Sequence, residues 1–532
     1  MDSSLLSSSC VPSTFSPNLF GASILSISAS LVSNTSAQVP LAYRFTQPAV
    51  NLTADAVYCN VTVTYTHPGQ NDTLNVEAWL PIESPTWNGR LQALGGGGWQ
   101  AGRYSLTYAG MQGALADGYA TVTTDSGLGT AEEASGWALL SPGNVNFYNL
   151  QNLASVSLND EAILAKSLIQ SFYGRKPEYS YWNGCSQGGR QGMMLAQRYP
   201  DAYDGLAVGA PGIYWSKLIP TFQWPQLVMN ILKSWPHACE IDAISAAAVK
   251  ACDGFDGVVD GIVGDIEQCL ATFDPFASVG QPGRNCSDAA ITVTEAAAIV
   301  FNVTTHGLTT AEGKKIWHGL SPGTDLTGNN PALTFGLGSG VATTNCTSGT
   351  CVGSIPIIAD QWLRLFVAND PKLNVANLTH KEFDRLVHLG TQRWGSTLDT
   401  DDADLTEFKN AGGKMVSFHG LDDSLVPPRG TEQYFDSVKS ILPDVDDFYR
   451  HYSIPGWAHC LGGYSASPSG LFSQLRAWVE NGTAPGETPV DVTVSSGEVQ
   501  ARIACPYPQV ARLNETCGNA AERQCWFCDS KQ

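Results

Sequence analysis

The first third of the chain contains short stretches in which apolar and polar residues alternate. Residues 58–65 and 74–80 alternate in this way and flank a turn rich in Asn, Gly and Asp, which predicts a β-hairpin. The apolar runs at 90–94 and 119–124 predict two buried strands. We therefore expect the amino-terminal part of the molecule to be built largely from a sheet.

A helix follows these strands. Residues 159–172 carry apolar side chains at helical spacing, and residues 179–182 then form another apolar run that predicts a strand. The run at 90–94 leads into four glycines, Gly95–Gly98. Strand, glycine turn, helix and strand in this order indicate an α/β fold with a parallel sheet.

The pattern changes between residues 213 and 412, where Cys, Gly, Pro and Thr are dense, helical patches are short and strands are hard to recognise. Residues 414–418 then form a buried strand again. The simplest organisation is an α/β domain in two parts, residues 1–212 and 413–532, interrupted by an inserted domain of residues 213–412.

The composition fits a globular protein. The chain has 532 residues, of which 43% are apolar and 15% charged, and its net charge is −20. Phosphate binding requires clustered Lys and Arg, so this acidic chain is not expected to bind nucleic acid or an anionic membrane. The longest weakly apolar stretch, residues 19–32, contains several serines and is too short to span a bilayer. No feature of the sequence indicates an oligomeric state.

Cysteines and glycosylation motifs point to an oxidising compartment. The chain has 14 cysteines, and ten Asn-x-Ser/Thr sequons are spread over its length. No secretion signal precedes Cys10, so the chain from Met1 resembles a mature form. These features predict a secreted glycoprotein with seven disulfides. Cys525 and Cys528 form a CxxC motif, but no thioredoxin-like βαβ pattern surrounds them, which disfavours a redox role.

The segment Gly184-Cys-Ser-Gln-Gly188 matches the G-x-S-x-G motif of a nucleophile elbow, with Ser186 at its centre. The motif alone also occurs by chance, but here it follows the predicted strand at 179–182 and precedes a helical pattern at 189–199. The glycines permit the sharp turn that exposes the hydroxyl, and the amino-terminus of the helix favours developing negative charge. Ser186 is therefore the expected nucleophile.

An acid and a base follow in the last part of the chain. Asp423 comes after the buried strand at 414–418, and His459 lies in a later loop. α/β-hydrolases carry their triad in the chain order Ser, Asp, His. A neutral imidazole oriented by an aspartate can take the proton of the serine hydroxyl and return it to the leaving group. Asp422 is the alternative acid and His419 the alternative base, although the position of His419 at the strand end favours a structural role.

An oxyanion hole needs two N–H donors. The backbone amide of Gln187, directly after Ser186, is expected to supply one. The glycine run after the early strand can supply the other because bare glycine lets a substrate approach closely, and Gly97 is the expected donor. The alternative is a glycine turn that binds no ligand.

Several stretches of the sequence resemble the fungal tannase and feruloyl esterase family. They are GGGGW (95–99), GCSQGGRQGMMLAQRYPDAYDGLAVGAP (184–211), ACDGFDGVVDGIVGDIEQC (251–269), KKIWHGLSPG (314–323), HGLDDSLVPP (419–428), GWAHC (456–460) and CPYPQ (505–509). The resemblance implies an α/β-hydrolase domain with Ser186, Asp423 and His459 as its triad, and an inserted lid domain.

The resemblance also implies a disulfide between Cys185 and Cys460, the neighbours of the expected nucleophile and base. Such a bond would hold together two residues that are far apart in the sequence; the alternative is that both cysteines have other partners. The pairs preferred for the remaining cysteines are Cys10–Cys59, Cys252–Cys269, Cys346–Cys351 and Cys505–Cys528, and elimination leaves Cys239–Cys286 and Cys517–Cys525.

An acidic, glycine-rich loop lies between Cys252 and Cys269. Its spacing is not that of an EF-hand, but carboxylates and backbone carbonyls are the ligands that a hard cation prefers. Without the resemblance, a solvated acidic turn would be an equally good interpretation. The resemblance implies a structural calcium ion in the lid domain, held by a set of five residues: Asp253, Asp256 and Asp260 through their side chains, and Val258 and Ile262 through their carbonyls.

The sequence therefore predicts a secreted serine esterase, and the resemblance implies esters of plant phenolic acids, small or attached to polysaccharides, as its substrates. We expect a feruloyl esterase. A tannase acting on galloyl esters is the alternative, since no local motif separates the two. Trp215, Trp224 and Trp317 are candidates for an acyl pocket or for the lid core. The alternative of another class is a glycoprotein that binds phenolics or cell-wall polymers without catalysis, which the complete triad disfavours.

Overall fold

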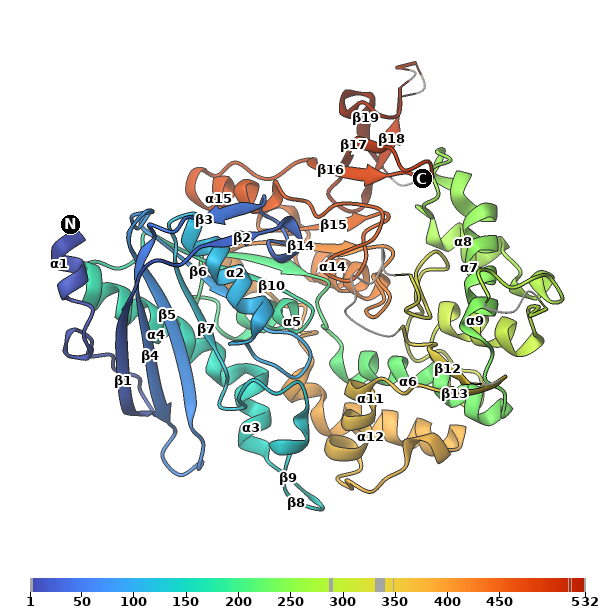
Figure 1. The fold of residues 1–532 in the computed structure, drawn as a ribbon, viewed down its shortest axis with the longest axis horizontal. Coiled ribbons are helices and arrows are strands. Elements are labelled where there is room, and N and C mark those ends of the chain that lie inside the picture. Colours follow the sequence, from blue (N-terminus) through green and yellow to red (C-terminus); the bar gives the residue numbers. More distant parts are fainter. Residues whose placement is uncertain are drawn as a thin grey trace.

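The computed structural model describes residues 3–286, 290–330, 340–347, 349–514, 516–517 and 519–530. Met1 and Asp2, the expected start of a mature form, lie outside these residues. Figure 1 shows a central sheet flanked by helices, with mostly helical segments from the middle of the chain on one side of it. Short carboxy-terminal hairpins lie at the border between the two parts (Figure 1).

The central sheet has nine strands in the order β1-β4-β5-β7-β6-β10-β11-β14-β15 (Figure 1). They are β1 (Ser23–Val32), β4 (Val57–Thr66), β5 (Leu74–Glu83), β6 (Arg90–Leu94), β7 (Ala120–Thr124), β10 (Tyr179–Cys185), β11 (Gly205–Gly209), β14 (Lys414–Gly420) and β15 (Tyr449–Ile454). The strands from β1 to β7 pair antiparallel, and those from β7 to β15 pair in parallel. The expected α/β-hydrolase fold is therefore present.

The predicted hairpin is formed by β4 and β5, in which Tyr65 pairs with Leu74. β1 was not predicted, because Ser residues alternate with its apolar residues and the sequence gives it no clear buried face. The strand lies at the edge of the sheet and is largely exposed along its length. Ile24, Ile27 and Ala29 of this strand are partly buried against the core, and its backbone pairs with β4 alone.

Helices cover both faces of the sheet. One face carries α4 (Ser157–Tyr173), α5 (Gln187–Arg198) and α14 (Arg429–Ile441), and the other carries α2 (Ser105–Ala116) and α15 (Leu471–Asn481). Leu206 and Val208 of β11 pack with the first group, and Ala207 between them packs with the second. Successive side chains of a strand point to opposite faces, so one short apolar strand contributes to both cores.

Residues 213–412 form mostly helices beside the sheet (Figure 1). Their elements are α6 (Trp215–Leu232), α7 (Ala238–Cys252), α8 (Ile266–Thr272), α9 (Glu295–His306), α11 (Ile357–Gln361), α12 (His380–Leu398), α13 (Thr406–Asn410) and the hairpin of β12 (Thr344–Thr347) and β13 (Thr350–Gly353). The boundaries of an inserted domain at 213 and 412 remain a prediction.

The expectation that helical patches in this segment are short is wrong for α6 and α12, which have 18 and 19 residues. α6 contains Pro220 and Pro225 and is buried on most of its surface. Its sequence therefore lacks both the helix propensity and the amphipathic period that identify a helix.

The remaining elements are short. They are α1 (Ser3–Ser8), α3 (Phe147–Gln151), β2 (Ala37–Val39), β3 (Val50–Leu52), β8 (Leu139–Ser141), β9 (Asn144–Val145), β16 (Thr488–Thr493), β17 (Val499–Ala504), β18 (Gln509–Leu513) and β19 (Trp526–Ser530). None of the helices in the described part of the chain combines the length and apolar character that a membrane span requires.

Seven disulfides join the 14 cysteines, in the same pairs that the sequence analysis favoured. The two cysteines of a pair are separated by as few as 5 residues, for Cys346–Cys351, and by as many as 275, for Cys185–Cys460. The CxxC cysteines Cys525 and Cys528 are not bonded to each other, because Cys525 pairs with Cys517 and Cys528 with Cys505.

Candidate active site

Ser186 sits in a sharp turn between a strand and a helix. β10 ends at Cys185 and α5 begins at Gln187. Ser186 has φ 62° and ψ −119°, a backbone conformation that costs energy for any residue with a side chain. A Cβ atom on Gly184 would lie 2.6 Å from the backbone of Gly188, so a larger residue does not fit there. The predicted strand–turn–helix context of the G-x-S-x-G motif is therefore present.

Asp423 and His459 are in direct contact. The Nδ1 atom of His459 lies 2.7 Å from Oδ2 of Asp423, and the Asp423 side chain is completely buried. The Oδ1 atom of Asp423 accepts hydrogen bonds from the backbone amides of Leu425 and Val426, each 2.8 Å long. These contacts fix the carboxylate so that it can orient the imidazole.

Charge and hydrogen bonding keep Asp423 ionised. Burial alone would raise its pKa, but the charge of His459 and hydrogen bonds from His419 and His459 hold the pKa of this carboxyl well below its usual range. The neighbouring Asp422 is also buried, but burial and then the charge of Asp260 raise its pKa to about 7. Of the two candidate acids, only Asp423 contacts His459.

A disulfide brings the two halves of the site together. The Cα atoms of Cys185 and Cys460, the neighbours of Ser186 and His459, lie 5.8 Å apart. Both cysteines are buried in a small cluster with Ala210. Because 275 residues separate the two cysteines, this bond links the first and last parts of the chain directly beside the candidate nucleophile and base.

The glycine loop at 95–98 follows β6 and packs against the turn at Ser186. The amide of Gly188 donates to the carbonyl of Gly96 over 2.9 Å, and the amide of Gly96 donates to the side chain of Gln191 over 2.9 Å. A Cβ atom on Gly95 would lie 2.6 Å from Gly188, so glycine is required for this close approach. The loop is thereby held against the start of α5.

The amides of this loop differ in whether they are free to bind a ligand. The N–H of Gly97, the expected oxyanion donor, donates to the carbonyl of Gln100 over 3.0 Å within its own turn. Among the described residues, the N–H groups of Gly98 and Gln187 have no acceptor. Gly98 has a positive φ of 56°, which favours glycine at this turn.

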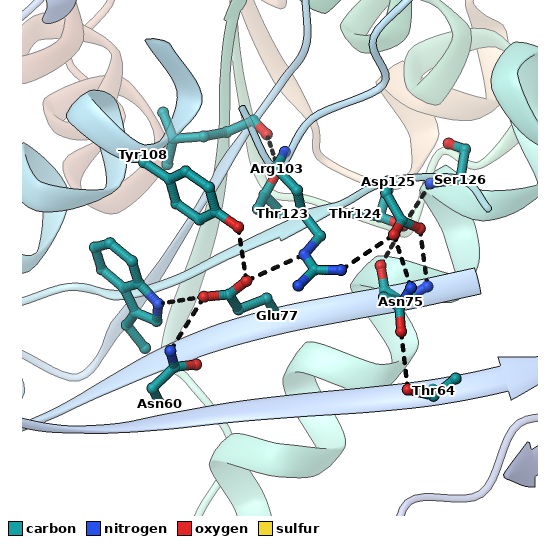
Figure 2. Close-up of polar contacts among 12 residues, drawn as sticks. Asn60, Thr64, Asn75, Glu77, Arg103, Tyr108, Thr123, Thr124, Asp125 and Ser126 are labelled. Atoms are coloured by element: carbon teal, nitrogen blue, oxygen red, sulfur yellow. Dashed lines mark hydrogen bonds and ion pairs between the residues drawn. The ribbon is translucent and has the colours of Figure 1, made fainter. Parts of the chain in front are cut away.

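A polar network that the sequence analysis did not find surrounds Arg103, five residues after the glycine loop. Figure 2 shows Arg103 between two carboxylates: its Nε lies 3.1 Å from Glu77 and its Nη1 lies 3.1 Å from Asp125. Glu77 also accepts a hydrogen bond from Tyr108 (Figure 2) and another from Trp79. Arg103 lies in the loop before α2, and its partners come from β5, α2 and the residue after β7. No motif connects them in the sequence.

Arg190 is a second residue near the site that the sequence analysis did not identify. It is completely buried on α5, and its Nε donates to the side chain of Gln187 over 2.7 Å. Its other nitrogens donate to the carbonyls of Leu398, Leu153 and Ala154. Burial lowers the pKa of Arg190 to about 9. The helix that follows Ser186 is thereby tied to the end of α12, in residues 213–412.

Of the three tryptophans proposed for an acyl pocket, Trp215 packs against the residue that follows the glycine loop. Its ring centre lies 5.2 Å from that of Trp99, the residue after Gly98. Trp224 packs against His380 and Phe383, within residues 213–412. All three tryptophans are buried; the third, Trp317, packs against Tyr214.

In the expected calcium loop, the aspartate side chains accept hydrogen bonds from backbone amides of the same loop. Asp253 accepts hydrogen bonds from the amides of Asp260 and Gly261, Asp256 from that of Val258, and Asp260 from that of Ile262. The other oxygen of Asp260 forms an ion pair with Arg502. In the described residues, the loop does not bring one oxygen from each of three carboxylates within 4.8 Å of one another.

The donor set of this loop nevertheless fits a hard cation. Burial, together with the negative charges of Asp260 and Asp253, raises the pKa of Asp256 to about 6. Burial also raises the pKa of Asp260, although Arg502 opposes the shift. Carboxylates that lack compensating charge favour a bound cation, and carboxylate and carbonyl oxygens are the ligands of Ca²⁺. Asp253, Asp256 and Asp260 and the carbonyls of Val258 and Ile262 would hold it.

Comparison with known proteins shows which family the chain resembles. A sequence model of the family described as tannase and feruloyl esterase matches residues 59–528. A probable feruloyl esterase of Arthroderma benhamiae is 36% identical over 87% of this chain and 84% of its own. A mono(2-hydroxyethyl) terephthalate hydrolase of Piscinibacter sakaiensis is 31% identical over 81% of this chain and 78% of its own.

A solved structure shows the same architecture. A tannin acyl hydrolase of Aspergillus niger superposes with a TM-score of 0.84 and 27% identity, covering 98% of this chain and 95% of the other. The match of the family model covers most of the chain, from β4 to β19. The chain is a carboxylic ester hydrolase, and it belongs to the tannase and feruloyl esterase family.

Proposed function

We propose that this protein is a secreted serine esterase that cleaves esters of plant phenolic acids, with hydroxycinnamoyl esters such as feruloyl esters as its preferred substrates. One observation carries the catalytic part of the proposal. The Asp423–His459 pair and the strained turn at Ser186 are linked through the disulfide between their neighbours, Cys185 and Cys460.

The proposed reaction proceeds through an acyl-enzyme. His459 takes the proton of the Ser186 hydroxyl as its oxygen attacks the ester carbonyl, and it returns that proton to the leaving alcohol. Water, deprotonated by His459, then releases the acid and regenerates Ser186. Asp423 holds the imidazole in the required orientation and stabilises its protonated form.

Backbone amides stabilise the oxyanion in this scheme. The free N–H of Gln187 supplies one hydrogen bond, as expected from the sequence. For the second donor, we favour Gly98 over Gly97, since the N–H of Gly97 already has an acceptor in Gln100. The substrate would then lie beside Trp99 and Trp215, whose rings are in contact.

Two substrate classes remain in competition. The relatives are named for feruloyl esters, tannins and a terephthalate monoester, and each of these is an ester of an aromatic acid. The feruloyl assignment follows the relative with 36% identity. A tannase is the second candidate, supported by the TM-score of 0.84 with the tannin acyl hydrolase.

We infer two further properties. Seven disulfides and ten sequons support secretion, because such a set of disulfides persists only in an oxidising compartment. The acidic loop is proposed to bind a structural Ca²⁺ ion, supported by its donor set and by the raised pKa of Asp256. When bound, the ion would neutralise the loop carboxylates, while Arg502 continues to pair with Asp260.

Hydrolysis of methyl ferulate, methyl gallate and mono(2-hydroxyethyl) terephthalate, measured in parallel with Ser186→Ala as control, tests the proposal. We expect methyl ferulate to be cleaved fastest and all activity to disappear in the variant. A higher kcat/KM for methyl gallate would make the protein a tannase. A folded wild-type protein that neither cleaves an ester nor reacts with a fluorophosphonate would support a binding protein instead, since only an activated serine reacts with that reagent.

A further inference from the structure

A second histidine contacts the carboxylate of Asp423. His419 lies on β14, four residues before Asp423, and is completely buried. Its Nε2 atom lies 3.1 Å from Oδ2 of Asp423 and 3.1 Å from the carbonyl oxygen of Val426. An ionised carboxylate and a carbonyl only accept hydrogen bonds, so Nε2 carries a proton.

The other ring nitrogen of His419 is also satisfied. Its Nδ1 lies 2.8 Å from the hydroxyl oxygen of Thr431, a buried residue of α14. The hydroxyl can donate its proton to Nδ1, so the neutral imidazole with its proton on Nε2 meets both contacts. Thr431 therefore selects the form of His419 that donates to Asp423.

Both histidines share one oxygen of Asp423. Oδ2 lies 2.7 Å from Nδ1 of His459 and 3.1 Å from Nε2 of His419, while the other carboxylate oxygen is occupied by two backbone amides. A second donor to Oδ2 withdraws negative charge from the oxygen that faces His459. The carboxylate then stabilises a protonated His459 less than it would with His459 as its only side-chain donor.

We propose that His419 is a positioning residue of the triad: its N–H fixes the rotamer of Asp423 and moderates the charge of Oδ2, so that His459 stays neutral, and able to accept the proton of Ser186, at lower pH. This inference rests on the proposed triad and adds to it a residue that contacts neither substrate nor nucleophile.

The other ionisable groups near this cluster do not take that role. His451 of the neighbouring strand β15 is buried and contacts Ser417, and burial lowers its pKa to about 3, so it is neutral. The side chain of Asp422 lies near Gly323, and no hydrogen bond joins it to Asp423. In the part of the chain that the structure describes, His419 is the second ionisable side chain hydrogen-bonded to Asp423, after His459.

The pH dependence of kcat/KM separates this role from a purely structural one. We compare His419→Leu, which removes the donor, with His419→Gln, whose amide can replace it, and with His451→Gln as a matched change on the next strand. For His419→Leu we expect kcat/KM to fall about tenfold on the acidic side and the acidic limb to move up by about 0.5–1 pH unit, with KM little changed. His419→Gln should recover most of the loss, and His451→Gln should leave the limb in place.

Two results would overturn the inference: a wild-type profile in folded His419→Leu, or a loss of equal size at every pH. If His419→Leu does not fold, the pH profiles of His419→Gln and Thr431→Val test the role of His419 instead. Thr431→Val removes the partner of Nδ1 and should move the acidic limb in the same direction by a smaller amount, and an unmoved limb in both variants counts against the role.

The pH dependence of fluorophosphonate labelling at Ser186 is recorded alongside turnover, because it reports the activated serine without depending on the substrate. A wild-type protein that is labelled but cleaves no aromatic ester would refute the proposed substrate class, and the labelling profile would still test His419. A wild-type protein that is not labelled at all would refute the triad, and the role of His419 with it.

Discussion

Carboxylates at the catalytic end of the sheet and in residues 213–412 differ in how their negative charge is compensated. Asp423 receives four hydrogen bonds, two from backbone amides and two from histidines, and its pKa lies well below the usual range. In residues 213–412, burial raises the pKa of Asp256 to about 6 and that of Asp399 to about 7. Asp423 is therefore ionised without any bound ligand. Asp256 and Asp399 would instead be stabilised by binding a cation or a proton.

Asp422 and Asp423 show that this difference depends on surroundings rather than on sequence position. They are neighbours in the chain, yet the pKa of Asp422 is raised to about 7, by burial and then by Asp260 of the acidic loop. Asp423 contacts the two histidines, while Asp422 lies beside residues of the 213–412 segment. A carboxylate is held as an anion only where donors are preorganised around it.

The largest effect should come from exchanging these two carboxylates for amides. Asp423→Asn is expected to lower kcat about 10³–10⁴-fold, because the amide no longer holds His459 in the required tautomer and orientation. Asp422→Asn should change kcat little, because the side chain of Asp422 does not contact His459, and its raised pKa leaves it partly protonated near pH 7. Steady-state kinetics with a ferulate or gallate ester, together with a melting curve for each variant, tests the pair. Equal losses of kcat would contradict the assignment of Asp423.

Removal of the Cys185–Cys460 disulfide should have the next largest effect. The chain-entropy model gives an upper figure of about 5–6 kcal/mol for a loop of this length and about 3 kcal/mol for Cys252–Cys269. We expect Cys185→Ala combined with Cys460→Ala to fold but to lose at least about tenfold in kcat/KM, because small displacements of catalytic groups are costly. Cys252→Ala with Cys269→Ala is the matched control and should lower the melting temperature with little change in kcat. Full activity without the first disulfide would argue against its positioning role.

Chelation of calcium should lower the melting temperature of the protein more than it lowers kcat. A ligand at 100 times its Kd stabilises the folded state by about 2.7 kcal/mol, so EGTA is expected to lower the melting temperature, and added Ca²⁺ should restore it. Asp253→Asn should reduce this response, since it removes a proposed ligand. Calorimetry of the two proteins with and without EGTA measures the effect. An unchanged melting temperature in the wild-type protein would remove calcium from the proposal.

The smallest effect on activity should come from replacing Asp399 by Asn. Asp399 accepts hydrogen bonds from the amide and hydroxyl of Ser216 at the start of α6. Its folded pKa of about 7 lies above the ordinary value of 3.8, chiefly because of burial. Between about pH 4 and pH 7 the unfolded chain releases this proton while the folded protein keeps it, so the free energy of unfolding falls as the pH rises. Asp399→Asn should flatten the pH dependence of the free energy of unfolding over this range. Denaturant unfolding at several pH values measures the slope, and an unaltered slope would show that Asp399 does not titrate in this range.

The outline of the fold could be predicted because its elements carry local signals. β4 and β5 alternate in polarity, β6 ends in glycines, and the motif around Ser186 is contiguous. α6 escaped prediction because burial on most of its surface removes the amphipathic period. The Arg103 network escaped prediction because Glu77 on β5 and Asp125 just after β7 meet Arg103 only in the folded protein.

The sequence by itself determined the α/β organisation, the family, and which Ser, Asp and His are candidates for a triad. Only the tertiary structure decided that Asp423 rather than Asp422 contacts His459, that Gly97 has an acceptor while Gly98 has none, and that His419 shares the carboxylate. The physical reason is that motifs depend on contiguous residues. The charge state of a group, its hydrogen-bond partners and its free donors depend instead on which distant segments meet. Here the Cys185–Cys460 bond joins the end of β10 to the loop that follows β15.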